Sequence, residues 1–283
     1  MSTNYKKYIL STGTHYISNS GSDENKQYHG GNAGDQTGNE WCLKRWYNRP
    51  WTCVLRWPGI DVGTLIAQLS IDAALNDKVG YDQYQRTTYW SQLKNVGYIP
   101  SRITVACEED CTAGVSSNVR AAGYLLGIDA LKNIPICSSR NMRAEFKKAG
   151  FIVLTDSKYL TSGNYLLPGD ILLYDNHHAA ANVTKGKNVS YEYHDVLNNI
   201  NGYLEKPNAI EVPAINKSIV EATGNVNVRK APGTDMPICG IAHKGERFSY
   251  RGVTKNVNGR DWYAINFNDQ DGWVSSKYSK LVK

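Results

Sequence analysis

The spacing of the apolar residues changes once along this chain, and that change limits its possible folds more than any other feature. Between residues 62 and 149 apolar side chains recur at every third or fourth position, the period of an amphipathic helix. From residue 217 onward they alternate in short segments separated by turn residues, which is typical of a small barrel. The chain has 283 residues, enough for two domains. We therefore predict an α+β domain followed by a small all-β domain.

The boundary between these domains is predicted from a segment of weak periodicity. Residues 199–216 read NINGYLEKPNAIEVPAIN and contain two prolines, which is typical of a linker. We place the first domain at residues 1–205, the linker at 206–216 and the second domain at 217–283. The first domain is expected to hold four helices, followed by an antiparallel sheet. These helices span residues 62–78, 81–96, 111–126 and 139–149.

The positive charge of the chain is concentrated near its C-terminal end. The net charge is +6, and residues 217–283 contain eleven Lys or Arg against six Asp or Glu. A basic surface attracts polyanions through its long-range field, so the candidate partners are nucleic acid and the anionic polymers of a bacterial wall. Basic and acidic residues alternate here without a long basic run, which ranks a nucleic-acid-binding protein lowest.

The chain lacks the sequence marks of a membrane protein and of a secreted one. Its mean hydropathy is −0.48, and no apolar run approaches the roughly 18 residues of a membrane-spanning helix. The segment MSTNYKKYILSTGTHYISNSGSD has no apolar core followed by a cleavage site, so we expect synthesis in the cytoplasm without a signal peptide. The six cysteines form no closely spaced framework, which favours free thiols.

One cysteine and one histidine carry the strongest chemical signal. Cys111 lies in the first turn of a predicted helix, where backbone N–H groups and the helix dipole favour a thiolate. His178 begins the alternating segment HAAANV and could supply the base. We interpret Asp110 as the helix cap and expect Glu108 and Glu109 to face solvent. The plainer alternative is that the cysteine and the histidine are packing residues.

A zinc site is the other chemical alternative for these residues. Its ligands would be Cys107, Cys111, His177 and His178. Adjacent residues on a strand point to opposite faces, so the two histidines cannot easily share a metal. The chain also lacks paired CxxC motifs. We therefore expect neither a metal nor a cofactor.

Two segments resemble motifs of a known family. DCTAGV, at residues 110–115, resembles the nucleophile motif of the NlpC-type cell-wall cysteine peptidases. LLPGDILLYDNHHAAANV resembles that family's PGD strand and histidine strand, with His178 rather than His177 at the catalytic position. GDQTGNEWCLKRWYNRPW also resembles a stretch found in phage and mobile-element members of this group. The resemblance implies a papain-like peptidase domain.

The resemblance also implies further site residues. The family's third polar residue aligns with Ser190 through a predicted hairpin turn at residues 185–187, with Asn188 as the alternative and His194 farther along. Gln36 could supply an oxyanion hydrogen bond, or belong to a surface turn. Trp46 and Tyr47, with Trp51, could line a substrate groove, although such aromatic residues are more often part of a core.

The C-terminal segment resembles bacterial SH3 domains. GNVNVRKAPG is similar to their opening, and DWYAINFNDQDGWVSSKYSKLV is similar to their closing strands. Such domains in wall hydrolases hold the enzyme on peptidoglycan or on its attached anionic polymers. The alternative is a barrel that only packs on the peptidase. A groove lined by Trp262, Tyr263 or Trp273 is the expected peptide site.

These observations predict an endolysin-like peptidoglycan hydrolase. The expected reaction is attack by Cys111 on an amide of the stem peptide, between D-glutamate and the third residue as the resemblance implies. An N-acetylmuramoyl-L-alanine amidase with the same dyad is the nearest alternative. A non-catalytic wall-binding or tail structural protein is the next. The protein is expected to act at the bacterial wall, released by a phage or mobile element or carried on a virion.

Overall fold

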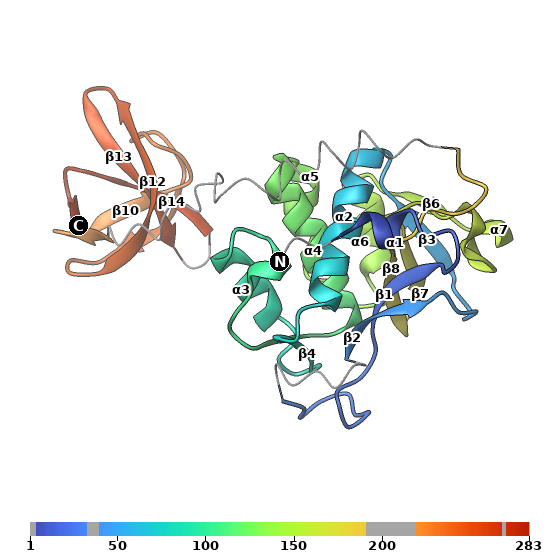
Figure 1. Cartoon of the computed structure of the whole chain (residues 1–283). Coiled ribbons are helices and arrows are strands. Elements are labelled where there is room, and N and C mark those ends of the chain that lie inside the picture. Colours follow the sequence, from blue (N-terminus) through green and yellow to red (C-terminus); the bar gives the residue numbers. More distant parts are fainter. Residues whose placement is uncertain (1–3, 33–39, 191–218, 268–269, 283) are drawn as a thin grey trace. The chain divides into compact units, whose positions relative to one another are not determined.

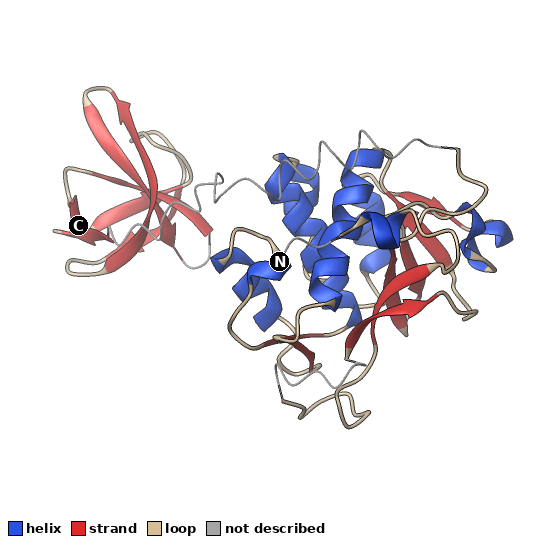
Figure 2. Cartoon of the chain, in the orientation of Figure 1, coloured by secondary structure: helices blue, strands red, loops and turns tan. Residues whose placement is uncertain are grey.

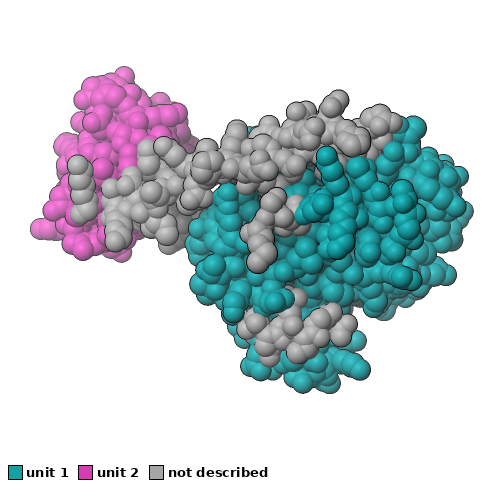
Figure 3. All heavy atoms as spheres, in the orientation of Figure 1, with its two compact units in different colours: residues 1–207 teal, residues 208–283 magenta. Residues whose placement is uncertain are grey.

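The computed structural model describes residues 4–32, 40–190, 219–267 and 270–282, which form two compact units. The first unit comprises residues 1–207 and the second residues 208–283, shown in teal and magenta in Figure 3. The predicted linker at residues 206–216 lies outside the described residues. Within the described part, no helix is long and apolar enough to cross a membrane.

A six-stranded antiparallel sheet forms the centre of the first unit. Its strand order is β2-β1-β8-β7-β3-β6, so β8 lies inside the sheet between the N-terminal strand β1 and β7. In that order the strands are Trp41–Arg45, Tyr16–Ser20, His178–Asn182, Ile171–Tyr174, Cys53–Arg56 and Ile152–Leu154. The predicted turn follows β8, but residues 183–190 form no strand, and the rest of the expected second arm lies outside the described residues.

Two long helices cover the central strands (Figures 1 and 2). Helix α2 (Ile60–Ala74) and helix α4 (Cys111–Leu126) pack against each other and against β1 and β8. The Ser18 hydroxyl of β1 donates to the Ser70 carbonyl of α2 at 2.8 Å, which fixes the face that α2 covers. The remaining helices are α1 (Lys6–Ile9), α3 (Thr88–Asn95), α5 (Asp129–Lys132), α6 (Met142–Ala149), α7 (Ser157–Leu160) and the 3-10 turns Pro100–Arg102 and Gly163–Tyr165.

The predicted helix over residues 81–96 is wrong at its start. Tyr81 belongs to β4 (Val79–Tyr81), which pairs in parallel with β5 (Cys107–Glu109). The helix begins only at Thr88, because the Asp82 carboxylate accepts the backbone N–H groups of Tyr84 and Gln85 and holds a turn there. This turn leaves the end of β4 beside the start of α4.

Local sequence signals define both ends of α4. Asp110 caps the helix by accepting the N–H groups of Thr112 and Ala113 at 2.9 and 2.8 Å. Gly127 ends it in the left-handed conformation, with φ of +73°. A Cβ at Gly114 would lie 2.7 Å from the Trp41 ring, so only glycine permits this close approach. The helix is therefore held with its first residue, Cys111, next to the sheet.

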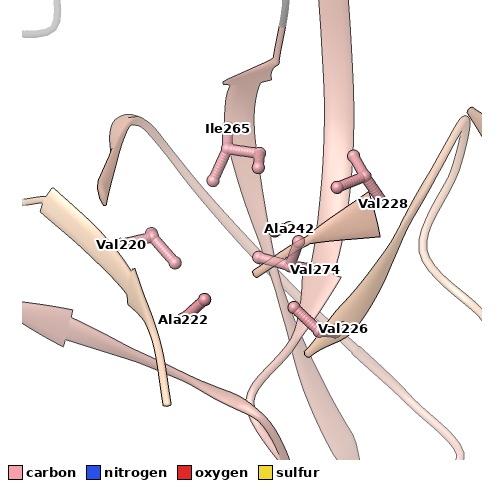
Figure 4. Packing of buried hydrophobic residues seen from close by; sticks show 7 residues of the cluster. All are labelled: Val220, Ala222, Val226, Val228, Ala242, Ile265 and Val274. Atoms are coloured by element: carbon pink, nitrogen blue, oxygen red, sulfur yellow. The ribbon is translucent and has the colours of Figure 1, made fainter. Parts of the chain in front are cut away.

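The second unit is all-β, as predicted. Its seven strands have the order β11-β10-β14-β13-β12-β9-β15. Small and β-branched side chains fill its core, which Figure 4 shows from close by: Val220, Ala222, Val226, Val228, Ala242, Ile265 and Val274. The strands β9 to β15 are Ile219–Ala222, Val226–Arg229, Ile238–Ala242, Arg247–Val257, Arg260–Phe267, Gln270–Ser275 and Ser279–Val282.

Candidate functional site

A cavity of about 570 Å³ opens where β1, β2, β8 and the start of α4 meet. Cys111 and His178 both line it, so the structure brings together the two residues with the strongest sequence signal. Each lies at the end of its element, Cys111 as the first residue of α4 and His178 as the first residue of β8. Asn19, Tyr47 and Tyr81 are also in its wall.

Cys111 is half-buried, and its thiol lies against β8. Its sulfur accepts a hydrogen bond from the backbone N–H of Ala179, the residue that follows His178. Burial is the largest influence and raises the pKa of the Cys111 thiol to about 12, and the Asp110 carboxylate acts in the same direction. The helix N-terminus favours a thiolate, but here burial and the acidic neighbour outweigh it. These influences favour the neutral thiol.

The two glutamates before the cysteine do not face solvent, so that expectation is wrong. Glu108 and Glu109 are 2% and 0% exposed. The Ser20 hydroxyl donates to Glu109 from the adjoining strand β1. Burial raises the pKa of Glu109 well above its ordinary value, which favours its neutral form. A neutral Glu109 limits the negative charge that lies beside Cys111.

Arg86 offsets the carboxylate nearest to the nucleophile. Its guanidinium forms a two-pronged ion pair with Asp110 and also donates to the Cys137 carbonyl and the Thr112 hydroxyl. Such a fork fits a carboxylate in a fixed orientation. The charge of Arg86 also acts to lower the pKa of Cys111. Arg86 thus holds the helix cap and weakens its effect on the thiol.

His178 is held in one orientation by two neighbours. Its Nε2 lies 2.9 Å from Asn19 Oδ1, and its ring stacks on Trp51 at 6.0 Å between centroids. Because an amide oxygen only accepts hydrogen bonds, Nε2 carries the proton and Nδ1 keeps its lone pair. The Tyr47 hydroxyl donates to the same Asn19 oxygen at 3.0 Å. Asn19, on β1, therefore bonds the imidazole directly, a contact that the sequence interpretation expected from Ser190.

The electrostatic surroundings of His178 favour its neutral form. Burial is the largest influence and lowers its pKa to about 3, and the positive charges of Arg49 and Lys44 lower it further. A buried imidazole next to cations resists protonation because its positive charge would be poorly hydrated and repelled, and the opposing effect of the Asp110 carboxylate is smaller. The resting dyad is therefore a neutral thiol and a neutral imidazole.

The other predicted residues are distributed unevenly. Trp46 and Tyr47 both pack against one hydrophobic cluster, but only Tyr47 lines this cavity, whereas Trp46 lines a smaller cavity of about 310 Å³ near His15. Ser190 and Asn188 are exposed and line neither cavity. Gln36 and His194 lie outside the described residues. His177 is exposed in the turn before β8 and stacks on Tyr174.

Tyr81 is a site residue that the sequence did not indicate. Its hydroxyl accepts a hydrogen bond from Gln83 Nε2 at 3.0 Å. Burial is the largest influence and raises the pKa of Tyr81 well above its ordinary value. The phenol therefore stays protonated near the sulfur and can donate. Predicting it required the position of β4, which the helical interpretation of residues 81–96 had hidden.

The same surroundings offer little to a metal ion. Among the described residues, no group of three or more His, Cys, Asp or Glu side chains could hold one. Cys107, one of the zinc ligands considered from the sequence, is buried on β5, where its thiol lies 3.6 Å from the Lys78 carbonyl. Apart from charged side chains, the cavity offers thiol, imidazole, amide and phenol groups.

Comparison with known proteins assigns both units. The family model described as endolysin-like domain matches residues 17–189, and the model of the bacterial SH3 domain matches residues 224–280. No curated protein matches the chain. The first match covers more than half of the chain and includes Asn19, Cys111 and His178. A chain with these two domains is a cell-wall hydrolase or a cell-wall-binding protein. The chain belongs to the endolysin-like domain family and carries a bacterial SH3 domain after it.

Proposed function

We propose that this protein is a papain-like cysteine endopeptidase that hydrolyses the stem peptide of peptidoglycan. The observation that carries the proposal is the shared cavity, in which Cys111 and an Asn19-bound His178 both lie. The bond we propose is that between D-glutamate and the third stem residue, which rests on the resemblance of DCTAGV and LLPGDILLYDNHHAAANV to NlpC-type peptidases.

The proposed reaction starts from a neutral dyad. His178 Nδ1 takes the thiol proton as Cys111 Sγ attacks the peptide carbonyl carbon, and a C–S bond forms. The imidazolium then gives this proton to the leaving amine as the C–N bond breaks, which leaves a thioester. Water, deprotonated by the neutral His178, attacks the thioester carbonyl. The C–S bond breaks, the thiol regains its proton, and the product acid departs.

Two donors are placed to stabilise the oxyanion of the tetrahedral intermediates. Asp110 accepts the N–H groups of Thr112 and Ala113, which leaves the Cys111 N–H at the helix start for an incoming oxygen. The Tyr81 hydroxyl supplies the second hydrogen bond from the cavity wall. Donors fixed in a site shielded from water stabilise developing charge strongly.

We further propose that Asn19 positions His178 in place of Ser190. An amide oxygen bonded to Nε2 selects the tautomer whose Nδ1 is basic, which is the role of an orienting residue in a catalytic dyad. The Tyr47 hydroxyl and the pairing of β1 with β8 hold Asn19 itself. Ser190 is exposed and lies outside the cavity wall.

The SH3 unit is proposed to hold the enzyme on peptidoglycan and its anionic polymers. Residues 217–283 contain eleven basic and six acidic residues, and this positive net charge favours polyanions. Trp273 is half-buried with Lys255 over its ring at 5.8 Å, and Tyr263 is half-buried against the core. Trp262 is only 3% exposed, so Trp273 and Tyr263 are the better candidates for contact with peptide.

Mass spectrometry of the products from purified peptidoglycan tests the enzyme proposal. The full chain should release fragments with a new amino terminus at the third stem residue. Cys111→Ala should release none, and Cys107→Ala should retain most of the activity. Products cut between the sugar and L-alanine would instead identify an amidase. Lysis by Cys111→Ala would exclude the proposed nucleophile.

Sedimentation with purified walls tests the binding proposal separately. Cys111→Ala should sediment with walls at low salt, and less of it should do so at high salt, because screening weakens the attraction between the basic unit and wall polymers. A variant that stays in the supernatant at low salt would contradict the wall-binding role.

A further inference from the structure

We propose that Lys44 and Arg49 form a subsite for a free carboxylate of the substrate, next to His178. This inference deepens the proposed function and rests on it. Both side chains line the cavity that contains Cys111 and His178. The ligand class is a peptide carboxylate close to the scissile amide, as opposed to its uncharged carboxamide.

The strand register places Lys44 on the His178 side of the sheet. Asn19 of β1 lies opposite Cys42 of β2, and Ile17 lies opposite Lys44. Opposed residues of an antiparallel pair share a face, so Lys44 projects from the same face as Ile17. Ile17 and Asn19 are two residues apart on β1 and also share a face, so Lys44 and Asn19 project from the same face. Asn19 forms a hydrogen bond with His178, so Lys44 lies on the same face of the sheet as the imidazole.

Arg49 reaches the same place from the loop between β2 and β3. Its NH1 lies 3.4 Å from the Tyr47 hydroxyl, and that hydroxyl donates to Asn19. Aromatic rings hold both cations: Lys44 lies 5.1 Å from the centre of the Tyr47 ring, and Arg49 lies 5.8 Å from that of Tyr174. The two charges are thereby positioned before any ligand arrives.

Neither cation has an acidic partner within ion-pair distance among the described residues. Arg86 and Arg56, by contrast, each form a pair with a buried aspartate. Positive charge in a partly enclosed cavity without a counter-ion favours an anionic ligand. Lys44 and Arg49 therefore differ from the arginines whose role is to hold the fold.

The acidic residues described in the cavity wall form hydrogen bonds within their own loop and no ion pair with Lys44 or Arg49. Asp23 accepts the backbone N–H groups of Asn25 and Gln27, and Glu24 accepts from Asn32. These bonds hold both carboxylates in their own loop, between β1 and β2. Lys26, the third cation of the wall, is exposed on that loop and offers a matched control.

Occupation of this subsite would also act on the catalytic base. Lys44 and Arg49 both lower the pKa of His178. A carboxylate bound between them would offset their charge, so the imidazole would accept a proton more readily. A substrate with the free acid would thus gain both affinity and turnover over its amidated form.

Four synthetic stem peptides separate the possible sources of the carboxylate. Each is L-alanyl-γ-D-glutamyl-L-lysyl-D-alanine, with the glutamyl α-carboxylate either free or amidated and the C-terminus either free or amidated. At one of these two positions, the full chain should cleave the peptide with a free carboxylate with a kcat/KM about tenfold higher than that for the peptide amidated there. A tenfold difference is what the loss of one charged contact should cause. The amidation that lowers the rate identifies the carboxylate that binds at Lys44 and Arg49.

Variants then test which residues bind the carboxylate. K44Q/R49Q should cleave free and amidated peptides at nearly equal rates, whereas K26Q should keep the wild-type preference. Lys44→Arg should retain the preference of a cationic site. Circular dichroism of each variant checks its fold. An unchanged preference in folded K44Q/R49Q, or no preference in the wild type, would overturn the subsite while leaving the peptidase proposal intact.

Binding to the inactive protein separates the two proposals. In Cys111→Ala, calorimetry should show tighter binding of the free-carboxylate peptide than of its amide, and K44Q/R49Q in that background should remove the difference. If the wild type cleaves none of the four peptides but this binding difference remains, the peptidase proposal fails and the subsite stands. Equal binding of acid and amide would overturn the subsite.

Discussion

The two sides of the cavity have opposite electrostatic character. The Asp110 carboxylate lies near Cys111 and raises the pKa of its thiol. Cations surround the base, where Arg49 and Lys44 lower the pKa of His178. Each side therefore favours the uncharged form of the group that it surrounds, and burial, the larger influence on both, acts in the same direction. The comparison teaches that opposite charges on the two sides of one cavity favour the same outcome, a neutral thiol and a neutral imidazole.

Removal of the base should produce the largest effect on this balance. His178→Ala should lower the hydrolysis rate about 100-fold or more, because the neutral Cys111 thiol then has no acceptor for its proton. The measurement is the rate of release of soluble muropeptides from purified walls. His177→Ala should lose far less, since His177 is exposed and stacks on Tyr174. Equal losses of activity in the two variants would contradict the assignment of His178, rather than His177, as the base.

Loss of the residue that orients the base should have a smaller effect. Asn19→Ala leaves the imidazole in place but removes the acceptor at Nε2, so kcat should fall about 100-fold at most while KM changes little. Asn19→Gln should recover part of this loss if its longer amide reaches the ring. Ser190→Ala should behave as the wild type. A large loss in Ser190→Ala and none in Asn19→Ala would restore Ser190 as the positioning residue.

The acidic side can be tested by alkylation of Cys111 in the absence of substrate. Since the pKa of Cys111 is raised to about 12, the thiolate fraction and the rate of labelling by iodoacetamide should increase about tenfold per pH unit between roughly pH 7 and pH 10. Peptide mapping identifies the labelled thiol. A rate that levels off near neutral pH would indicate a preformed thiolate and would contradict the neutral dyad.

The smallest effect is expected from the pair that offsets Asp110. Arg86→Gln leaves that carboxylate uncompensated and should raise the pKa of Cys111 further, which slows alkylation at a fixed pH by about threefold. Arg56→Gln is the matched control, because it breaks an equivalent buried pair with Asp170. Equal slowing in both variants would mean that Arg86 acts only through stability.

The sequence predicted best what depends on local signals. Asp110 and Gly127 correctly indicated the ends of α4, and alternating apolar residues correctly indicated the all-β unit. Cys111 and His178 were found because each begins a recognisable element. In these cases, residues within a few positions of one another carry the information.

What the sequence did not reveal depends on contacts between distant segments. Asn19 meets His178 across 159 positions, through the pairing of β1 with β8, and no local pattern identifies that pairing. The burial of Glu109 follows from Ser20 and Gly114, on two other elements. Lys44 and Arg49 look like ordinary surface cations until the strand register is known.

The position of β8 inside the sheet has a consequence for the timing of activity. A ribosome that has completed residue 170 has already made Asn19 and Cys111, but not His178. β7 and β8 must both be made, and β8 must pair with β7 and with β1, before the His178 imidazole meets the Asn19 amide. A chain cut before β8 therefore keeps Asn19 and Cys111 but lacks the imidazole of the candidate site, so the site is complete only once nearly the whole first unit has been made.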